Sequence, residues 1–131
     1  MTYRWVDHTA EVELHVEAAG LEEVFADALA AFAELVGDSA EGAPARHEVE
    51  VTAQDLPTLL ADWLGELVFL AETEGLVPER ASTLELAGTT LRATVEGRHG
   101  EPSPIVKAVT YHGLELREDD GVWKARVVLD V

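Results

Sequence analysis

Hydrophobic and polar residues alternate along several stretches of this sequence, which is the pattern of a half-buried β-strand. The clearest stretch is Glu11 to Ala18, where Val12, Leu14 and Val16 point to one face while acidic residues and a histidine point to the other. Glycine-containing turns inside two further alternating regions predict two β-hairpins. The remaining strands or extended segments are expected at residues 3–6, 47–53, 83–86, 90–96, 105–111, 114–118 and 122–131.

Two other segments space their apolar residues three or four apart, as amphipathic helices do. The first covers residues 21–36 and is followed by Gly37, a natural helix terminator. The second covers about residues 56–73, with Asp55 as a candidate N-cap and Gly75 after its end. Its apolar stripe is unusually wide, which predicts a largely buried helix that packs on more than one neighbour.

Two helices among mostly hairpin-linked strands predict an α+β fold. We expect a two-layer sandwich in which one mainly antiparallel or mixed sheet of about six strands is covered on one face by both helices. At 131 residues the chain is long enough to bury a core without disulfides. We therefore expect a single domain over residues 1–131.

The charge balance narrows the classes of partner. The chain has 9 Lys and Arg against 26 Asp and Glu, a formal net charge of −17. Because nucleic-acid binding depends on Lys and Arg neutralising phosphates, direct RNA or DNA binding is not expected. An acidic surface instead attracts cations or a basic protein partner. Solubility alone accounts equally well for the bulk of the charge.

The absence of certain sequence features suggests a compartment and a class of metal ligand. No apolar run approaches the roughly 18 residues of a membrane span, and the amino terminus lacks a secretory pattern. The sequence contains no cysteine. These features favour the cytoplasm and no membrane association. Any bound metal would be held by oxygen or imidazole, which favours calcium, magnesium or manganese.

Candidate chemistry gathers near the two ends of the chain. Glu11 lies on the polar face of its expected strand, and Asp130 lies opposite the main apolar row of the last one. If these strands are neighbours, both carboxylates meet the terminal carboxylate of Val131. Three carboxylates so close together would repel one another unless a divalent cation neutralised them. Asp7 could orient a ligand or could equally form a turn. His8 could bind a metal or orient Glu11, but the sequence favours a capping or core histidine that is hydrogen-bonded to the backbone.

Four motifs, in this order along nearly the whole chain, resemble those of the archease family. Asp7-His8-Thr9-Ala10-Glu11 is similar to the family's "HTAD" signature, and Asp62-Trp63-Leu64-Gly65-Glu66-Leu67 is similar to its second-helix motif. Lys107-Ala108-Val109-Thr110-Tyr111-His112 resembles "KA-x-TYH". Trp123 followed by Val128-Leu129-Asp130-Val131 resembles the family's carboxyl end.

The resemblance implies an accessory protein rather than an enzyme. Archeases activate RtcB-type RNA ligases in tRNA splicing and RNA repair, by promoting guanylylation of the ligase by GTP and so permitting multiple turnover. The family's metal site maps onto Glu11, Asp130 and the carboxylate of Val131, and its functional lysine onto Lys107. Activation of the partner would then depend on Lys107 and Asp130. One departure is that Glu11 stands where the family usually has Asp.

Two alternatives come from other functional classes. The first is an acidic, chaperone-like module that binds basic proteins and gives a metal no role. The second is a small metal-dependent hydrolase that uses Glu11 and Asp130. Neither a Ser-His-Asp arrangement nor a glycine-rich phosphate loop is present in the sequence, so a free-standing hydrolase or nucleotide-binding enzyme has no positive support.

Overall fold

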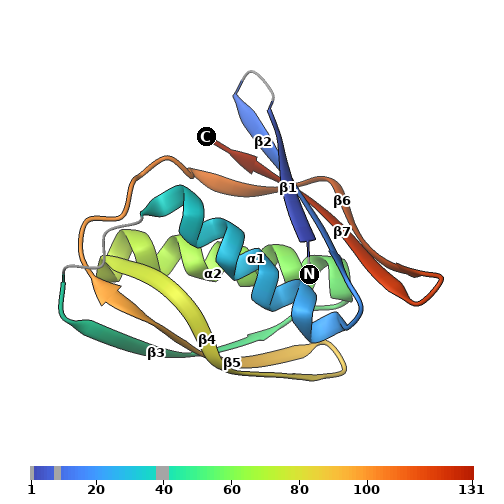
Figure 1. Cartoon of the computed structure of the whole chain (residues 1–131), viewed down its shortest axis with the longest axis horizontal. Coiled ribbons are helices and arrows are strands. Elements are labelled where there is room, and N and C mark those ends of the chain that lie inside the picture. Colours follow the sequence, from blue (N-terminus) through green and yellow to red (C-terminus); the bar gives the residue numbers. More distant parts are fainter. Residues whose placement is uncertain (1, 8–9, 38–41) are drawn as a thin grey trace.

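The computed structural model describes residues 2–7, 10–37 and 42–131, in which two helices are connected with seven strands (Figure 1). In chain order the elements are β1 (Thr2–Asp7), β2 (Glu11–Ala18), α1 (Leu21–Val36), β3 (Pro44–Thr52), α2 (Leu56–Glu74), β4 (Leu76–Ala87), β5 (Thr90–His99), β6 (Ala108–Asp119) and β7 (Val122–Asp130). No described helix is both long and apolar enough to cross a membrane.

The strands form two antiparallel sheets with the orders β1-β2-β7-β6 and β3-β5-β4. Both helices contact strands of both sheets, and Figure 1 shows the helices between them. The α+β class, the two helices and the antiparallel pairing are therefore confirmed. The expected single sheet is instead divided in two, because alternation identifies the buried face of each strand but not its neighbour.

The width of the α2 stripe is explained by this arrangement. Trp63 is fully buried, and its indole N–H donates a hydrogen bond of 2.9 Å to the carbonyl of Phe25 on α1. Leu60, Leu64 and Leu67 are also buried, so α2 is covered by α1 and by strands of both sheets. A helix covered on several sides needs apolar residues over most of its circumference.

The ends of the helices agree with the sequence. The Asp55 carboxylate accepts a hydrogen bond of 2.8 Å from the Thr58 amide and caps α2. Gly75 ends that helix with φ of 62°, a left-handed conformation that glycine adopts without strain. The final hairpin turn is also confirmed, since Asp120 and Gly121 both have positive φ, as a two-residue type I′ turn requires.

Two strands differ most from the sequence prediction, while β3 starts three residues earlier and β5 ends three residues later than expected. Strand β4 starts at Leu76 rather than near residue 83, and two register irregularities interrupt its alternation with β5. Strand β6 runs without a break across the expected gap between residues 111 and 114, with its register against β7 shifted between Thr110 and Glu115. Such shifts place successive residues out of the regular period of two, so pattern matching shortens or divides the strand.

Candidate functional site

The first residue of β2 and the last residue of β7 lie directly opposite each other. The strand register pairs Glu11 with Asp130, and Ala108 at the start of β6 lies on the other side of Asp130. The Val131 amide donates a hydrogen bond of 3.1 Å to the carbonyl of Ala10. This bond continues the ladder past β7 and holds Val131 beside the start of β2. We call the end of the sheet formed by Glu11, Asp130 and Val131 the acidic tip.

The two side chains of the acidic tip share one face of the sheet. Directly opposed residues of antiparallel strands have Cβ atoms about 4.5–5.5 Å apart, so the carboxylates of Glu11 and Asp130 are near neighbours. Both residues are partly exposed. Neither forms an ion pair with a Lys, Arg or His in the described part of the chain. Both carboxylates are therefore without a cationic partner among the described side chains.

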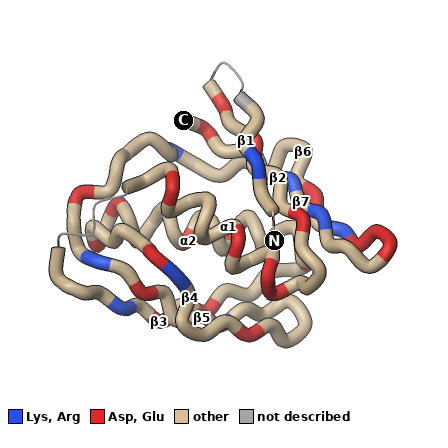
Figure 2. The backbone as a smooth tube through the Cα atoms, viewed as in Figure 1, with Lys and Arg blue, Asp and Glu red and all other residues tan. Residues whose placement is uncertain are grey.

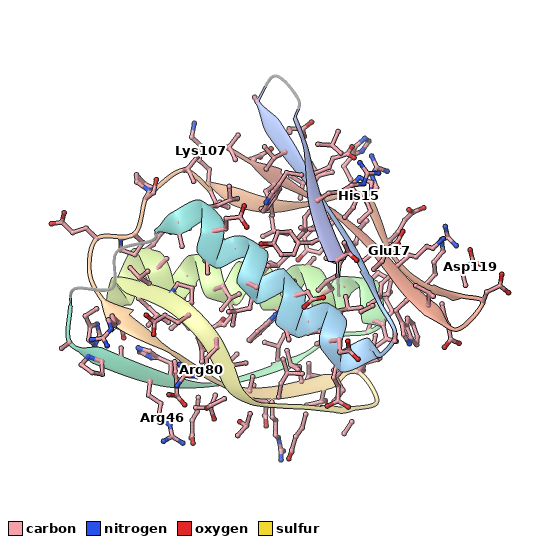
Figure 3. The ribbon with its side chains drawn as sticks, viewed as in Figure 1. His15, Glu17, Arg46, Arg80, Lys107 and Asp119 are labelled. Atoms are coloured by element: carbon pink, nitrogen blue, oxygen red, sulfur yellow. The ribbon has the colours of Figure 1, made fainter. Side chains whose placement is uncertain are left out.

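Lys107 lies in the segment that leads into β6, next to the acidic tip. Its backbone amide donates a hydrogen bond of 2.8 Å to the Asp130 carbonyl. Its side chain is exposed, and Figure 3 shows it pointing away from the body of the molecule. The backbone of Lys107 is thus fixed to the tip, while its ammonium group remains available to a partner.

The remaining predicted residues are only partly covered by the structure. The backbone of Asp7 ends β1 opposite Val12, one residue from Glu11, but its side chain is outside the described part. His8 also lies outside the described residues. Whether either residue orients a ligand stays a prediction.

The donor atoms of the acidic tip suit a hard divalent cation. Carboxylate oxygens are the ligands that calcium, magnesium and manganese prefer, and water can complete the coordination shell. Among the described residues, no group of three or more His, Asp or Glu side chains is arranged to hold a metal. Glu11 and Asp130 provide two carboxylates at facing strand positions, and the contribution of the Val131 carboxylate to a metal site stays a prediction. In its donor chemistry this set fits the ion.

A partly buried ionic network that the sequence analysis did not identify lies on the same face, two residues further along β2. Glu13 is only 8% exposed, and its carboxylate accepts hydrogen bonds from Arg126 at 2.7 Å and His15 at 3.0 Å. The hydrogen bond from the guanidinium to Glu13 raises the pKa of Arg126. Two polar residues on one strand face were visible in the sequence, but their partner on β7 follows only from the register.

A second unpredicted contact joins two of the sequence motifs. The hydroxyl of Tyr111 on β6 donates a hydrogen bond of 2.5 Å to the Asp62 carboxylate on α2. This bond raises the pKa of Tyr111, since ionisation would place two negative charges side by side. The contact helps to attach the first half of β6, which follows the Lys107 segment, to the helix beneath it.

Comparisons with known proteins agree on one family. Residues 3–131 match the Archease protein family. The archease of Methanothermobacter thermautotrophicus is 37% identical, with 98% of each chain covered, and that of Pyrobaculum neutrophilum is 34% identical, with 98% of this chain and 95% of the relative covered.

Solved structures show the same fold. The solution structure of a Methanobacterium thermoautotrophicum protein matches with a TM-score of 0.76 at 33% identity, over 98% of both chains. The crystal structure of a Thermotoga maritima archease, described as a possible chaperone, matches with a TM-score of 0.71 at 22% identity, over 100% of this chain and 98% of that one. At that lower identity the likeness concerns the fold alone.

Proposed function

The chain belongs to the archease family, and from this premise we propose that it is an accessory protein that activates an RtcB-type RNA ligase. In this role it promotes guanylylation of the ligase by GTP in tRNA splicing and RNA repair, in the cytoplasm, so that the ligase turns over repeatedly. The chemistry takes place in the partner, and this chain supplies groups to it.

The observation that carries the proposal is the juxtaposition of Glu11, Asp130 and Lys107 at the acidic tip. Glu11 and Asp130 are cross-strand partners, and Lys107 is hydrogen-bonded through its amide to Asp130. These residues come from the beginning and the end of the chain, and they coincide with the motifs that resemble the family's. A carboxylate pair next to an exposed lysine can contact both a cation and an anion.

The Glu11 and Asp130 side chains and the Val131 carboxylate would hold a divalent cation, with calcium, magnesium and manganese as candidates. When bound, such an ion supplies positive charge that positions phosphate oxygens and offsets charge on a leaving pyrophosphate. Lys107 would contact a phosphate or an acidic residue of the partner. The strongly negative surface, with its net charge of −17, would draw the tip toward a basic cleft.

A guanylylation assay with the RtcB-type ligase from the same source tests the proposal. Asp130→Asn and Lys107→Gln are each expected to lower stimulated multiple turnover at least tenfold, because each removes a charge from the tip. The matched controls are Glu85→Gln and Arg92→Gln, exposed residues of the other sheet, which should stimulate as the unaltered protein does. Full stimulation by both tip variants would contradict the proposal.

A second candidate is a chaperone-like module that uses only its acidic surface. The observation that favours it is the net charge of −17, which would attract basic proteins. This function requires that stimulation survive Asp130→Asn but be lost when several exposed glutamates distant from the tip are changed to glutamine. The same assay therefore separates the two candidates.

A further inference from the structure

The outer face of the β1-β2-β7-β6 sheet, which is turned away from the helices, carries a hollow of about 450 Å³. The register places Arg4, His15 and Arg126 side by side on three adjacent strands. The next row along the same face contains Glu17 and Lys124. Figure 3 shows His15 and Glu17 on this side of the sheet. We call this hollow the basic hollow, for the charges described next.

The lining of the basic hollow is much richer in cations than the molecule as a whole. Of the nine Lys and Arg residues in the chain, four line it, against two lining carboxylates, Glu17 and Glu115. Two further acids, Glu13 and Asp119, pair with three of these four cations and hold them in place. The whole chain has a net charge of −17. Figure 2 shows these cations along β1, β6 and β7.

The cations of the hollow are held in place to different degrees. Arg126 is fixed by Glu13 at 2.7 Å and by the Gly113 carbonyl at 3.4 Å. Lys124 lies 3.5 Å from Asp119, an acid at the hairpin turn that it shares with a second cation, Arg117. Arg4 is exposed and forms no ion pair with any residue that the structure describes. The hollow therefore combines an oriented guanidinium with an uncommitted one.

We propose that the basic hollow binds the phosphate group of a small ligand, a phosphomonoester or a pyrophosphate. Arginine presents a planar fork of N–H donors that matches phosphate oxygens two at a time, and Lys124 adds a point charge. A volume of about 450 Å³ lies in the usual range for small-molecule sites.

The acidic surface around the hollow limits the ligand to a small anion. A long polyanion such as RNA would extend beyond the hollow onto an acidic surface that repels it. A compact anion can lie against the cations of the hollow without reaching that surface. The site uses residues outside the acidic tip. The phosphate-binding proposal can therefore be right or wrong whether or not the protein activates a ligase.

Nitrogen-15 NMR titration tests the proposal, with inorganic phosphate, pyrophosphate, ribose 5-phosphate and adenosine 5′-monophosphate as probes at constant ionic strength. Saturable shifts confined to Arg4, His15, Lys124 and their neighbours are expected. Comparison of the four probes then shows whether the phosphate alone or the group that carries it determines affinity. Shifts that are absent, fail to saturate or are reproduced by sodium chloride would overturn the proposal.

Variants locate the binding. Arg4→Gln is expected to weaken the binding of the tightest-binding probe at least tenfold. The double variant Arg4→Gln with Lys124→Gln is expected to show no saturable binding. The matched control is Arg92→Gln, because Arg92 is an exposed arginine on the other sheet, paired with Glu50 at 2.6 Å. Unchanged spectra elsewhere verify the fold of each variant. Equal weakening by the control, or undiminished binding by the double variant, would contradict the assignment.

Discussion

Glu13 and Asp27 are the two carboxylate residues buried in the described part of the chain, and their surroundings differ. Glu13 is hydrogen-bonded to Arg126 and His15, so its charge is compensated. Asp27, on α1, is 4% exposed, and its Oδ2 atom has no hydrogen-bond partner among the described residues. Burial, with a contribution from the nearby Glu23 charge, raises the pKa of Asp27 above its ordinary value of 3.8.

Replacing Asp27 tests the cost of that buried charge. A raised pKa means that the folded state binds the proton more tightly than the unfolded state, so stability falls as pH rises above 3.8 through the raised value. Asp27→Asn should therefore be more stable than the unaltered protein at pH 7, by about 1 kcal/mol. The difference should vanish toward pH 3.5 in urea unfolding measured across this range. Glu72→Gln, which removes an exposed acid from α2, is the control. A less stable Asp27→Asn at pH 7 would refute this account.

The acidic tip supports a second prediction at the scale of single residues. If Glu11, Asp130 and Val131 hold a divalent cation, calcium should raise the melting temperature, because a ligand that binds only the folded state stabilises it. At a calcium concentration 100 times the dissociation constant the gain is about 2.7 kcal/mol. Asp130→Asn should lose most of this gain, and calorimetric titration should show at least tenfold weaker binding.

The controls for this experiment separate a specific site from general screening. Glu118→Gln removes an exposed acid near the opposite end of the same sheet and should leave the calcium effect intact. Sodium chloride at matched ionic strength should not reproduce the effect. Glu11→Asp shortens the side chain at the first ligand position by one methylene. Its calcium affinity, compared with that of the unaltered protein, shows how the longer Glu11 side chain affects binding. An equal calcium effect in Asp130→Asn would remove the tip from consideration as a metal site.

At the scale of elements, the helices were more predictable than the strands. The boundaries of α1 agree with the sequence prediction, since periodicity, an acidic first turn and Gly37 all point to the same segment. In contrast, β4 and β6 contain register shifts, which remove the alternation on which strand prediction depends. Local pattern determines helix boundaries because helical hydrogen bonds are local, whereas strand boundaries depend on partners far away in sequence.

Gly65 and Gly97 form a pair that tests how well each element tolerates a side chain. Gly65 lies within α2, and an added Cβ would meet no atom within 4 Å. Gly65→Ala should therefore stabilise the protein by about 0.5–1 kcal/mol, through the reduced entropy of the unfolded chain. On β5 a Cβ at Gly97 would lie 2.0 Å from the Val77 carbonyl oxygen, so Gly97→Ala should cost about 2 kcal/mol. Urea unfolding measures both. Equal effects of the two substitutions would contradict the packing described here.

At the scale of the whole molecule, the division into two sheets explains what the sequence could and could not predict about the site. Polar faces placed Glu11 and Asp130 on the outside of their strands, and the pairing of β2 with β7 then brought them together. The same pairing created the network of Glu13 and Arg126, which no local pattern indicated. Candidate residues can thus be selected from local alternation, but their partners depend on the strand order.

The net charge of −17 leads to a prediction about the whole molecule. With 26 acidic residues and nine basic ones, repulsion among carboxylates should outweigh the exposed ion pairs, which individually contribute little. Because salt screens this repulsion, raising sodium chloride from about 10 to about 200 mM at pH 7 should raise the melting temperature. Glu22→Gln, Glu72→Gln and Glu118→Gln combined remove three exposed charges and should reduce the slope. A melting temperature that falls with salt would mean instead that the ion pairs between strands, such as Arg92 with Glu50 and Arg80 with Glu96, dominate the electrostatics of the fold.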